Sequence, residues 1–250
     1  MRPVPAALLA VALSACLASP MPDAATTLTA EPIAVGPFHR VDVSGHAEVV
    51  LVQGDRETVT VEASPRNPAR VRVQSSGGRV RISVEDERGW SFGFHGARPP
   101  TITVHFRTLD TLGLAGAVKL QAAAIDTPSL AVNATGGTSF RIDQLKTGEL
   151  RFTGSGAVKG EIEGTATDQQ ISISGAGTFR GAKLVSDNVR ATVSGAGRVI
   201  VNAQKTLAAT ISGAGAIDYY GDPALKQRIT GAGKITRRGF DAAPAGARTA

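Results

Sequence analysis

Apolar and polar residues alternate with a period of two through much of the chain after Phe38. The pattern is clear in short runs such as TVTVEAS, RVRISVED and TITVHF, which are separated by turn-forming sequences such as SPRNP and SSGG. Alternation of this kind, bounded by Gly, Pro, Asn and Ser, is typical of half-buried β-strands. No long segment has the 3.6-residue apolar period of an amphipathic helix. We therefore expect an all-β protein whose N-terminal part is a region of antiparallel strands.

The second half of the chain contains an internal repeat built on two glycines. Related pentapeptides are FTGSG at 152–156, ISGAG at 173–177 and 211–215, VSGAG at 193–197 and ITGAG at 229–233. Aligned on the first glycine, the units contain Gly116, Gly136, Gly154, Gly175, Gly195, Gly213 and Gly231. The steps between them are 20, 18, 21, 20, 18 and 18 residues. Such a period is typical of a solenoid, in which stacked coils bury a continuous core. We expect a β-helix-like solenoid with coils of roughly 18–21 residues.

The parity of residues within each unit predicts which side chains face the core. From residue 152 onward, the residue two before the first glycine and the residue four after it are apolar. These positions share one face of a strand, so we expect them and both glycines to point inward. The glycines either let two walls approach closely or bend the chain through φ values that other residues resist.

The hydroxyl residues of the repeat should then form an outward ladder flanked by Ala176, Ala196 and Ala214. The ladder consists of Thr153, Ser174, Ser194, Ser212 and Thr230. Such a flat strip can dock a glycan or a partner sheet, or it can satisfy hydrogen bonds along a tight stack, and we favour the second interpretation.

The N-terminal residues have the pattern of an export signal. Arg2 precedes VPAALLAVAL, which is short for a membrane span but has the length of a signal-peptide core. The sequence LSAC, Leu13 to Cys16, resembles a bacterial lipobox and contains the only cysteine. We expect residues 1–16 to be a signal peptide, Cys16 to be lipidated and residues 17–37 to be a flexible tether. The alternative is a simple secretory signal that is removed together with Cys16.

Composition limits the classes of function open to this chain. With 42% hydrophobic residues, 29 glycines and 4% aromatics, it can build one aliphatic core with many turns. The net charge is +6, but the basic residues are scattered and accompany no recognised nucleic-acid-binding module, so a nucleic-acid partner is not expected. The solenoid domain should occupy residues 38–236, and the Ala-rich tail at 237–250 should be disordered.

Patterns for catalysis and metal binding are weak. His39, His46, His95 and His105 lie in unlike contexts with no ligand spacing, so no metal and no cofactor is expected.

The repeat region holds two acid pairs, Glu161 with Glu163 and Asp218 with Asp222. Each is more simply a solvated edge or a turn than the carboxylates of a polysaccharide-cleaving β-helix enzyme. The enzyme remains an alternative, and it predicts turnover that is abolished by a change at a carboxylate such as Asp218.

Two aromatic segments are candidate contact surfaces. The Gly-rich segment at 86–100 carries Trp90, Phe92 and Phe94, whose rings can stack on sugars, insert at a membrane interface or fold back over the open end of the solenoid. Tyr219 and Tyr220 have opposite parity, so one ring can lie in the core while the other is exposed.

Taken together, these segments resemble the bacterial DUF2807 family, called the putative auto-transporter adhesin, head GIN domain. The resemblance runs from about Phe38 to Ile235 and includes FHRVDVSGHAEVVLVQGD, ITVHFRTLDTLGLAGAVKL, the serial SGAG units and ISGAGAIDYYGDPALKQRITGAGKI. It implies an all-β solenoid in an envelope protein that is often attached by a lipoprotein signal. It implies no settled catalytic residues.

We therefore expect a non-catalytic binding or adhesion module of the bacterial cell envelope, lipid-anchored at the outer membrane or periplasmic. Its partner would be a polysaccharide, peptidoglycan or an envelope protein. A self-associating scaffold is a further alternative, in which the bare end coil makes the contact and homo-oligomers form.

Overall fold

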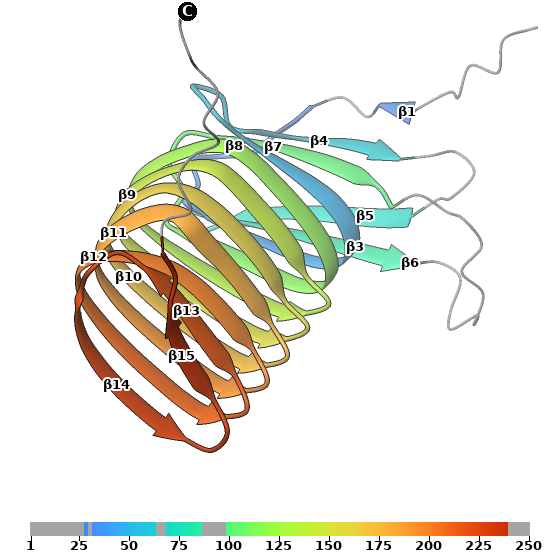
Figure 1. Ribbon diagram of the computed structural model, residues 1–250. Coiled ribbons are helices and arrows are strands. Elements are labelled where there is room, and N and C mark those ends of the chain that lie inside the picture. Colours follow the sequence, from blue (N-terminus) through green and yellow to red (C-terminus); the bar gives the residue numbers. More distant parts are fainter. Residues whose placement is uncertain (1–27, 30–31, 64–68, 87–98, 240–250) are drawn as a thin grey trace, which may run out of the picture.

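A single β-sheet winds into a solenoid in the computed structural model, which describes residues 28–29, 32–63, 69–86 and 99–239 (Figure 1). The sheet has fifteen strands, and the described residues contain no helix. The all-β solenoid expected from the sequence is confirmed.

Five long strands form the body of the solenoid. They are β8 (Thr111–Gly136), β9 (Ser139–Gly156), β10 (Lys159–Gly175), β11 (Thr178–Gly195) and β12 (Arg198–Gly213). Each pairs in parallel with the next, so each coil lies directly on its neighbour. The last coil consists of β13 (Ala216–Tyr220), β14 (Ala224–Thr230) and β15 (Lys234–Arg237). In this coil, β13 and β14 pair in parallel with β12, and β15 pairs with β13.

Additional strands cover the N-terminal end of the solenoid. They are β1 (Leu28–Thr29), β2 (Ile33–Ala34), β3 (Arg40–Gln53), β4 (Thr58–Ala63), β5 (Ala69–Ser76), β6 (Arg79–Asp86) and β7 (Thr101–Phe106). The antiparallel pairs expected here are present, between β5 and β6, between β4 and β7, and between β4 and the short strands β1 and β2. β3 pairs in parallel with β6, β7 and β8, so it joins this mixed region to the coils.

The strand register corrects the alignment of the repeat at one coil. Gly175 pairs with Gly156, and Gly156 pairs with Gly136, so the unit that contains FTGSG is aligned on its second glycine. Gly154 instead pairs with Ile173 in a core position. The corner glycines are therefore Gly116, Gly136, Gly156, Gly175, Gly195, Gly213 and Gly231. Their separations are 20, 20, 19, 20, 18 and 18 residues, which is more regular than the sequence alignment suggested.

The two glycines of each SGAG unit have different roles. The first, such as Gly195, has a φ of +118° and lies exposed at a corner of the coil. The second, such as Gly197, is buried, and a Cβ atom there would lie 2.8 Å from Cγ2 of Ile173. The expectation that both glycines face inward is therefore wrong for the first one, because the positive φ interrupts the alternation of the strand. Close approach therefore applies to both glycines, and the bend through positive φ applies to the first one.

The core consists of aliphatic rows with a short aromatic stack. The apolar residues on both sides of each corner before the last one are buried, as the parity predicted, and the last of them along the chain is Ile217. The rings of Phe140 and Phe152 lie with centroids 5.3 Å apart, and those of Phe152 and Phe179 lie 5.2 Å apart. In the last coil, the corresponding Ile229 is 42% exposed because no further coil covers it.

One polar side chain interrupts a core row of leucine and valine. Gln169 is in register with Leu150 and Val189 and is only 2% exposed. Its Oε1 accepts a hydrogen bond of 3.2 Å from Oγ of Ser186, and its Nε2 has no hydrogen-bond partner. A buried donor without a partner costs on the order of 1–3 kcal/mol.

Replacing a corner glycine should destabilise the fold. In Gly195→Ala, the new Cβ atom would lie 2.8 Å from the carbonyl oxygen of Gly175, and alanine resists a φ of +118°. We expect a loss of about 1–3 kcal/mol in the free energy of unfolding, measured by urea denaturation. The matched control is Ala196→Ser at the adjacent exposed position, which should be nearly neutral. Equal stability of the two variants would contradict the role given to the corner.

Removing the buried polar pair should stabilise the fold. The double variant Gln169→Leu with Ser186→Ala places a leucine in a row of apolar residues and an alanine in register with Ala166 and Ala203. We expect a gain of about 1–3 kcal/mol in the free energy of unfolding, because no buried donor is left unpaired. Gln169→Ala is the comparison, and it should destabilise by leaving a cavity. A lower melting temperature for the double variant would show that the core needs this polar pair.

Candidate binding surface

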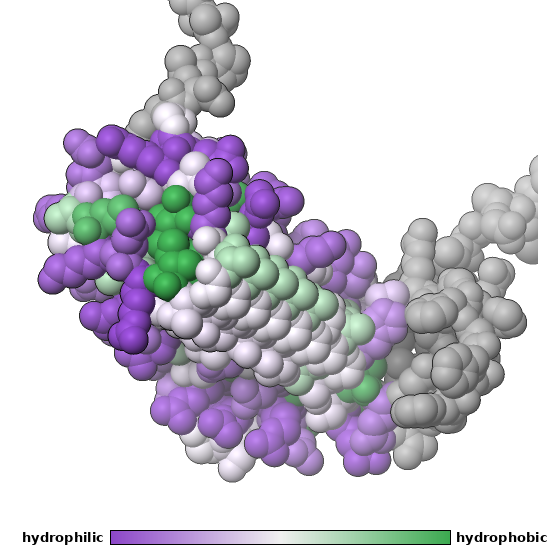
Figure 2. Space-filling model, turned by 60° about the horizontal axis from the view of Figure 1, so that its bottom comes forward, coloured by the Kyte–Doolittle hydropathy of each residue, from purple (hydrophilic) through white to green (hydrophobic). Residues whose placement is uncertain are grey.

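A flat strip of small residues runs along the glycine corner of the solenoid. Ser174, Ser194 and Ser212 are in register on one side of the corner glycines. Alanines follow the same glycines on the other side. Figure 2 shows the strip as pale, stepped rows along the length of the coils. The predicted ladder is corrected at one position, because Ser155, not Thr153, pairs with Ser174.

The hydroxyl groups of this strip face solvent. None of the hydroxyls of Ser155, Ser174, Ser194 and Ser212 forms a hydrogen bond with another described residue, and all four residues are exposed. The interpretation that the ladder satisfies hydrogen bonds along its own stack is therefore wrong for these serines. The strip consists of serine, glycine and alanine, so it carries no charged side chain.

The wall that follows the glycine corner carries a shallow groove of about 350 Å³ with basic margins. We call it the cationic groove, and its polar lining includes Lys119, Ser139, Arg141, Lys159, Glu161, Thr178 and Arg180. Four of these seven residues are cations, each from a different coil, and one, Glu161, is an acid.

The cations of the groove follow the register of the strands. Lys119, Ser139, Lys159 and Thr178 are in register along one row, so lysines alternate with hydroxyl residues. Arg141, Glu161 and Arg180 are in register along the neighbouring row. Since adjacent strands are about 4.8 Å apart, the two lysines are separated by roughly 10 Å.

Ion pairs neutralise part of this wall. Arg141 contacts Asp143 at 2.6 Å, Glu161 at 3.2 Å and Glu163 at 3.7 Å. The hydrogen bond with Asp143 and the nearby charge of Glu161 raise the pKa of the Arg141 guanidinium. Lys119 is 3.3 Å from Glu48.

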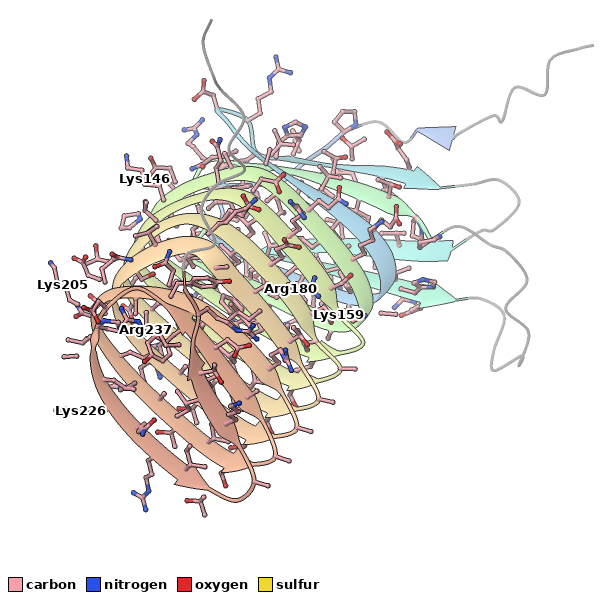
Figure 3. The ribbon with its side chains drawn as sticks, viewed as in Figure 1. Lys146, Lys159, Arg180, Lys205, Lys226 and Arg237 are labelled. Carbon is pink, nitrogen blue, oxygen red and sulfur yellow. The ribbon has the colours of Figure 1, made fainter. Side chains whose placement is uncertain are left out.

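Two cations of the groove remain available for a ligand. Neither Lys159 nor Arg180 forms an ion pair with any residue that the structure describes. Figure 3 shows them close together, whereas Lys146 and Lys205 lie apart from them at the left margin of the solenoid.

The acid pairs considered from the sequence are held in ion pairs. Glu163 binds Lys183 at 3.0 Å in addition to its contact with Arg141. The side chain of Asp218 is only 6% exposed and lies 3.0 Å from Arg238 and 3.8 Å from Arg198. The hydrogen bond from Arg238 to Asp218 raises the pKa of that guanidinium. A carboxylate enclosed in this way is poorly placed to act on a substrate, so Asp218 has a structural role.

The tyrosine candidates differ in exposure. Tyr219 is buried, so its expected role as a surface contact is wrong, while Tyr220 is half-buried. As their opposite parity predicted, the two rings lie in different surroundings.

The other candidates, Cys16, Trp90, Phe92 and Phe94, lie outside the described residues. Within the described ranges, no three His, Cys, Asp or Glu side chains are grouped so that they could hold a metal ion. Across the same ranges, no helix has the length and apolar character needed to cross a membrane.

Sequence reasoning missed the cationic groove because its cations are about 20 residues apart in the chain. They appear scattered until the register of the coils is known. The repeat itself contained the necessary signal, because Lys119 and Lys159 each lie three residues after a corner glycine. This relation was concealed because the FTGSG unit was aligned on Gly154 instead of Gly156.

Solved structures with the same fold come from Bacteroides and Parabacteroides species. A putative adhesin of Bacteroides fragilis superposes with a TM-score of 0.75 at 19% identity, covering 86% of this chain and 97% of that one. A putative lipid binding protein of Parabacteroides distasonis gives 0.64 at 17% identity, covering 85% and 96%. A putative adhesin of Parabacteroides merdae gives 0.63 at 18% identity, also covering 85% and 96%. These identities are low, so they establish the fold alone. No curated protein matches the chain.

The family model described as "Putative auto-transporter adhesin, head GIN domain" matches residues 37–223, which is most of the chain and nearly all of the solenoid. This range contains the opening strands, the SGAG corners and the cationic groove. A surface-binding role fits that description. The chain therefore belongs to the DUF2807 family of head GIN domain proteins.

Proposed function

We propose that the protein is a non-catalytic binding module of the cell envelope that holds an acidic polysaccharide in the cationic groove. The observation that carries this proposal is the pair Lys159 and Arg180, which lie on one wall without ion-pair partners among the described residues. An exposed cation that is not neutralised by the protein can attract the carboxylate or sulfate of a ligand.

The form of the groove supports a linear polyanion. Lys119 and Lys159 recur at every second coil, and Ser139 lies between them in register. A polysaccharide with acidic groups at regular intervals can place them beside successive cations and direct its hydroxyls toward Ser139 and Thr178. The groove is open and shallow, which suits a chain that extends beyond it in both directions.

The N-terminal segment supports a location in the cell envelope. The lipobox from Leu13 to Cys16 would attach the chain to a membrane by lipid, and the residues between Cys16 and β1 would separate the solenoid from the membrane surface. The spacer is shorter than the tether expected at 17–37, because β1 and β2 pair with β4. An anchored module with an exposed polymer-binding wall matches the adhesin description of the family. Absence of catalysis is part of this proposal, and it is supported by the ion pairs that enclose Asp218.

Affinity electrophoresis should show retardation by an acidic polysaccharide, such as polygalacturonate, and none by neutral dextran. The double variant Lys159→Glu with Arg180→Glu should migrate with little retardation, because it replaces two attractive charges by two repulsive ones. Retardation of the parent chain should also fall as salt is added.

The matched control is Lys146→Glu with Lys205→Glu, which makes the same change in net charge at the left margin of the solenoid, away from Lys159 and Arg180. It should retain the retardation of the parent chain. Equal loss in both double variants would show that net charge, and not the groove, causes retention. Loss in Trp90→Ala alone would assign the contact to the aromatic segment at 86–100. No retardation by any polysaccharide would contradict the proposed ligand class.

A further inference from the structure

The C-terminal coil has an open backbone edge. β14 pairs with β12 on one side, and β15 pairs with β13 on one side. No described strand pairs with the other edge of either one. At the opposite end, β6 and β7 pair with β3 and extend the sheet beyond the coils (Figure 1). A strand edge with unpaired N–H and C=O groups is a template for one more strand.

The apolar rows of the core are exposed at this edge. Leu225 is in register with Leu207, and Ile229 is in register with Ile211. Leu207 and Ile211 are almost completely buried, whereas Leu225 is 37% and Ile229 is 42% exposed. One additional strand would cover these two side chains as each coil covers the coil before it.

The positive charge of the last coil favours an acidic strand as its partner. Residues 221–239 include five basic side chains and a single acid, Asp222. Lys226 and Arg228 alternate with the apolar positions of β14, and neither forms an ion pair with a described residue. Arg237 and Arg238 are paired with Asp222 and Asp218.

We propose that the outer edge of β14 binds an extended acidic polypeptide segment, which adds to the solenoid as a parallel strand. Its apolar residues would cover Leu225 and Ile229, and its acidic residues would lie beside Lys226 and Arg228. The unpaired backbone favours a polypeptide over a polysaccharide at this end, because only a polypeptide supplies donors and acceptors at the strand spacing.

A second copy of the chain is a poorer occupant. Two copies that met through this edge would bring Lys226 and Arg228 toward the same cations of the other copy. At the N-terminal end of another copy, β3 is already paired with β6 and β7. This inference uses residues separate from the cationic groove, so either proposal can fail without the other.

A seven-residue peptide of alternating Glu and Val tests the proposal with the full chain. We expect binding by fluorescence anisotropy, and hydrogen exchange should slow in residues 224–230 when the peptide is bound. The variant Lys226→Glu with Arg228→Glu should bind at least about tenfold more weakly, because attraction becomes repulsion. Lys159→Glu with Arg180→Glu, which has the same net charge and changes β10 and β11 instead of β14, should bind the peptide as the parent does.

Two control peptides separate charge from strand pairing. A peptide of alternating Lys and Val should not bind, and the Glu and Val peptide methylated on alternate backbone nitrogens should lose binding. Equal binding of the Lys and Glu peptides, or protection outside residues 224–230, would overturn the proposal. Faster exchange of residues 224–230 after deletion of residues 240–250 would also overturn the proposal, because it would show that the chain's own tail occupies the edge in the parent protein. Concentration-dependent dimers that protect the same residues would assign the edge to self-association.

Discussion

The backbone of each coil turns at a glycine with positive φ, and the placement of the other residues depends on that turn. At Gly175, Gly195 and Gly213, φ lies between +113° and +126°. The residue after each corner donates its N–H to the corner glycine one coil before, as Ala196 does to Gly175 at 3.0 Å and Ala214 to Gly195 at 3.0 Å. A side chain at the corner would meet the preceding glycine's carbonyl oxygen. Glycine therefore keeps the coils close and in register.

The register converts a repeat in the sequence into rows on the surface. Residues about 20 positions apart become neighbours separated by one strand spacing, about 4.8 Å. Lys159 and Arg180, which are 21 residues apart in the chain, thereby come to line one groove. The same stacking leaves Leu225 and Ile229 uncovered where it ends. The groove and the open edge therefore both result from the stacking of the coils in register. They differ in the charged residues that they carry.

Much of the fold could be predicted from the sequence because alternation and repeat length report directly on strands and coils. The apolar rows followed from parity, and Phe152 and Ile173 are buried as expected. The alignment failed at FTGSG, where Gly154 occupies a core position and makes room beside the ring of Phe152. Parity also failed at the corners, because a residue with positive φ does not continue a strand. The ion pairs of Asp218 and the burial of Tyr219 depend on contacts between coils, which no local pattern contains.

The central claim is that the sign of φ at the corner, and not only a lack of space, requires glycine. D-Alanine at Gly213, introduced by ligation of a synthetic segment for residues 213–250, tests this directly because a D-residue favours positive φ and directs its Cβ away from the position of an L-Cβ. We predict that the D-alanine protein melts close to the parent, and that the L-alanine protein made in the same way melts well below it. Equal destabilisation by the two alanines would show that close packing alone demands glycine, which would contradict the account.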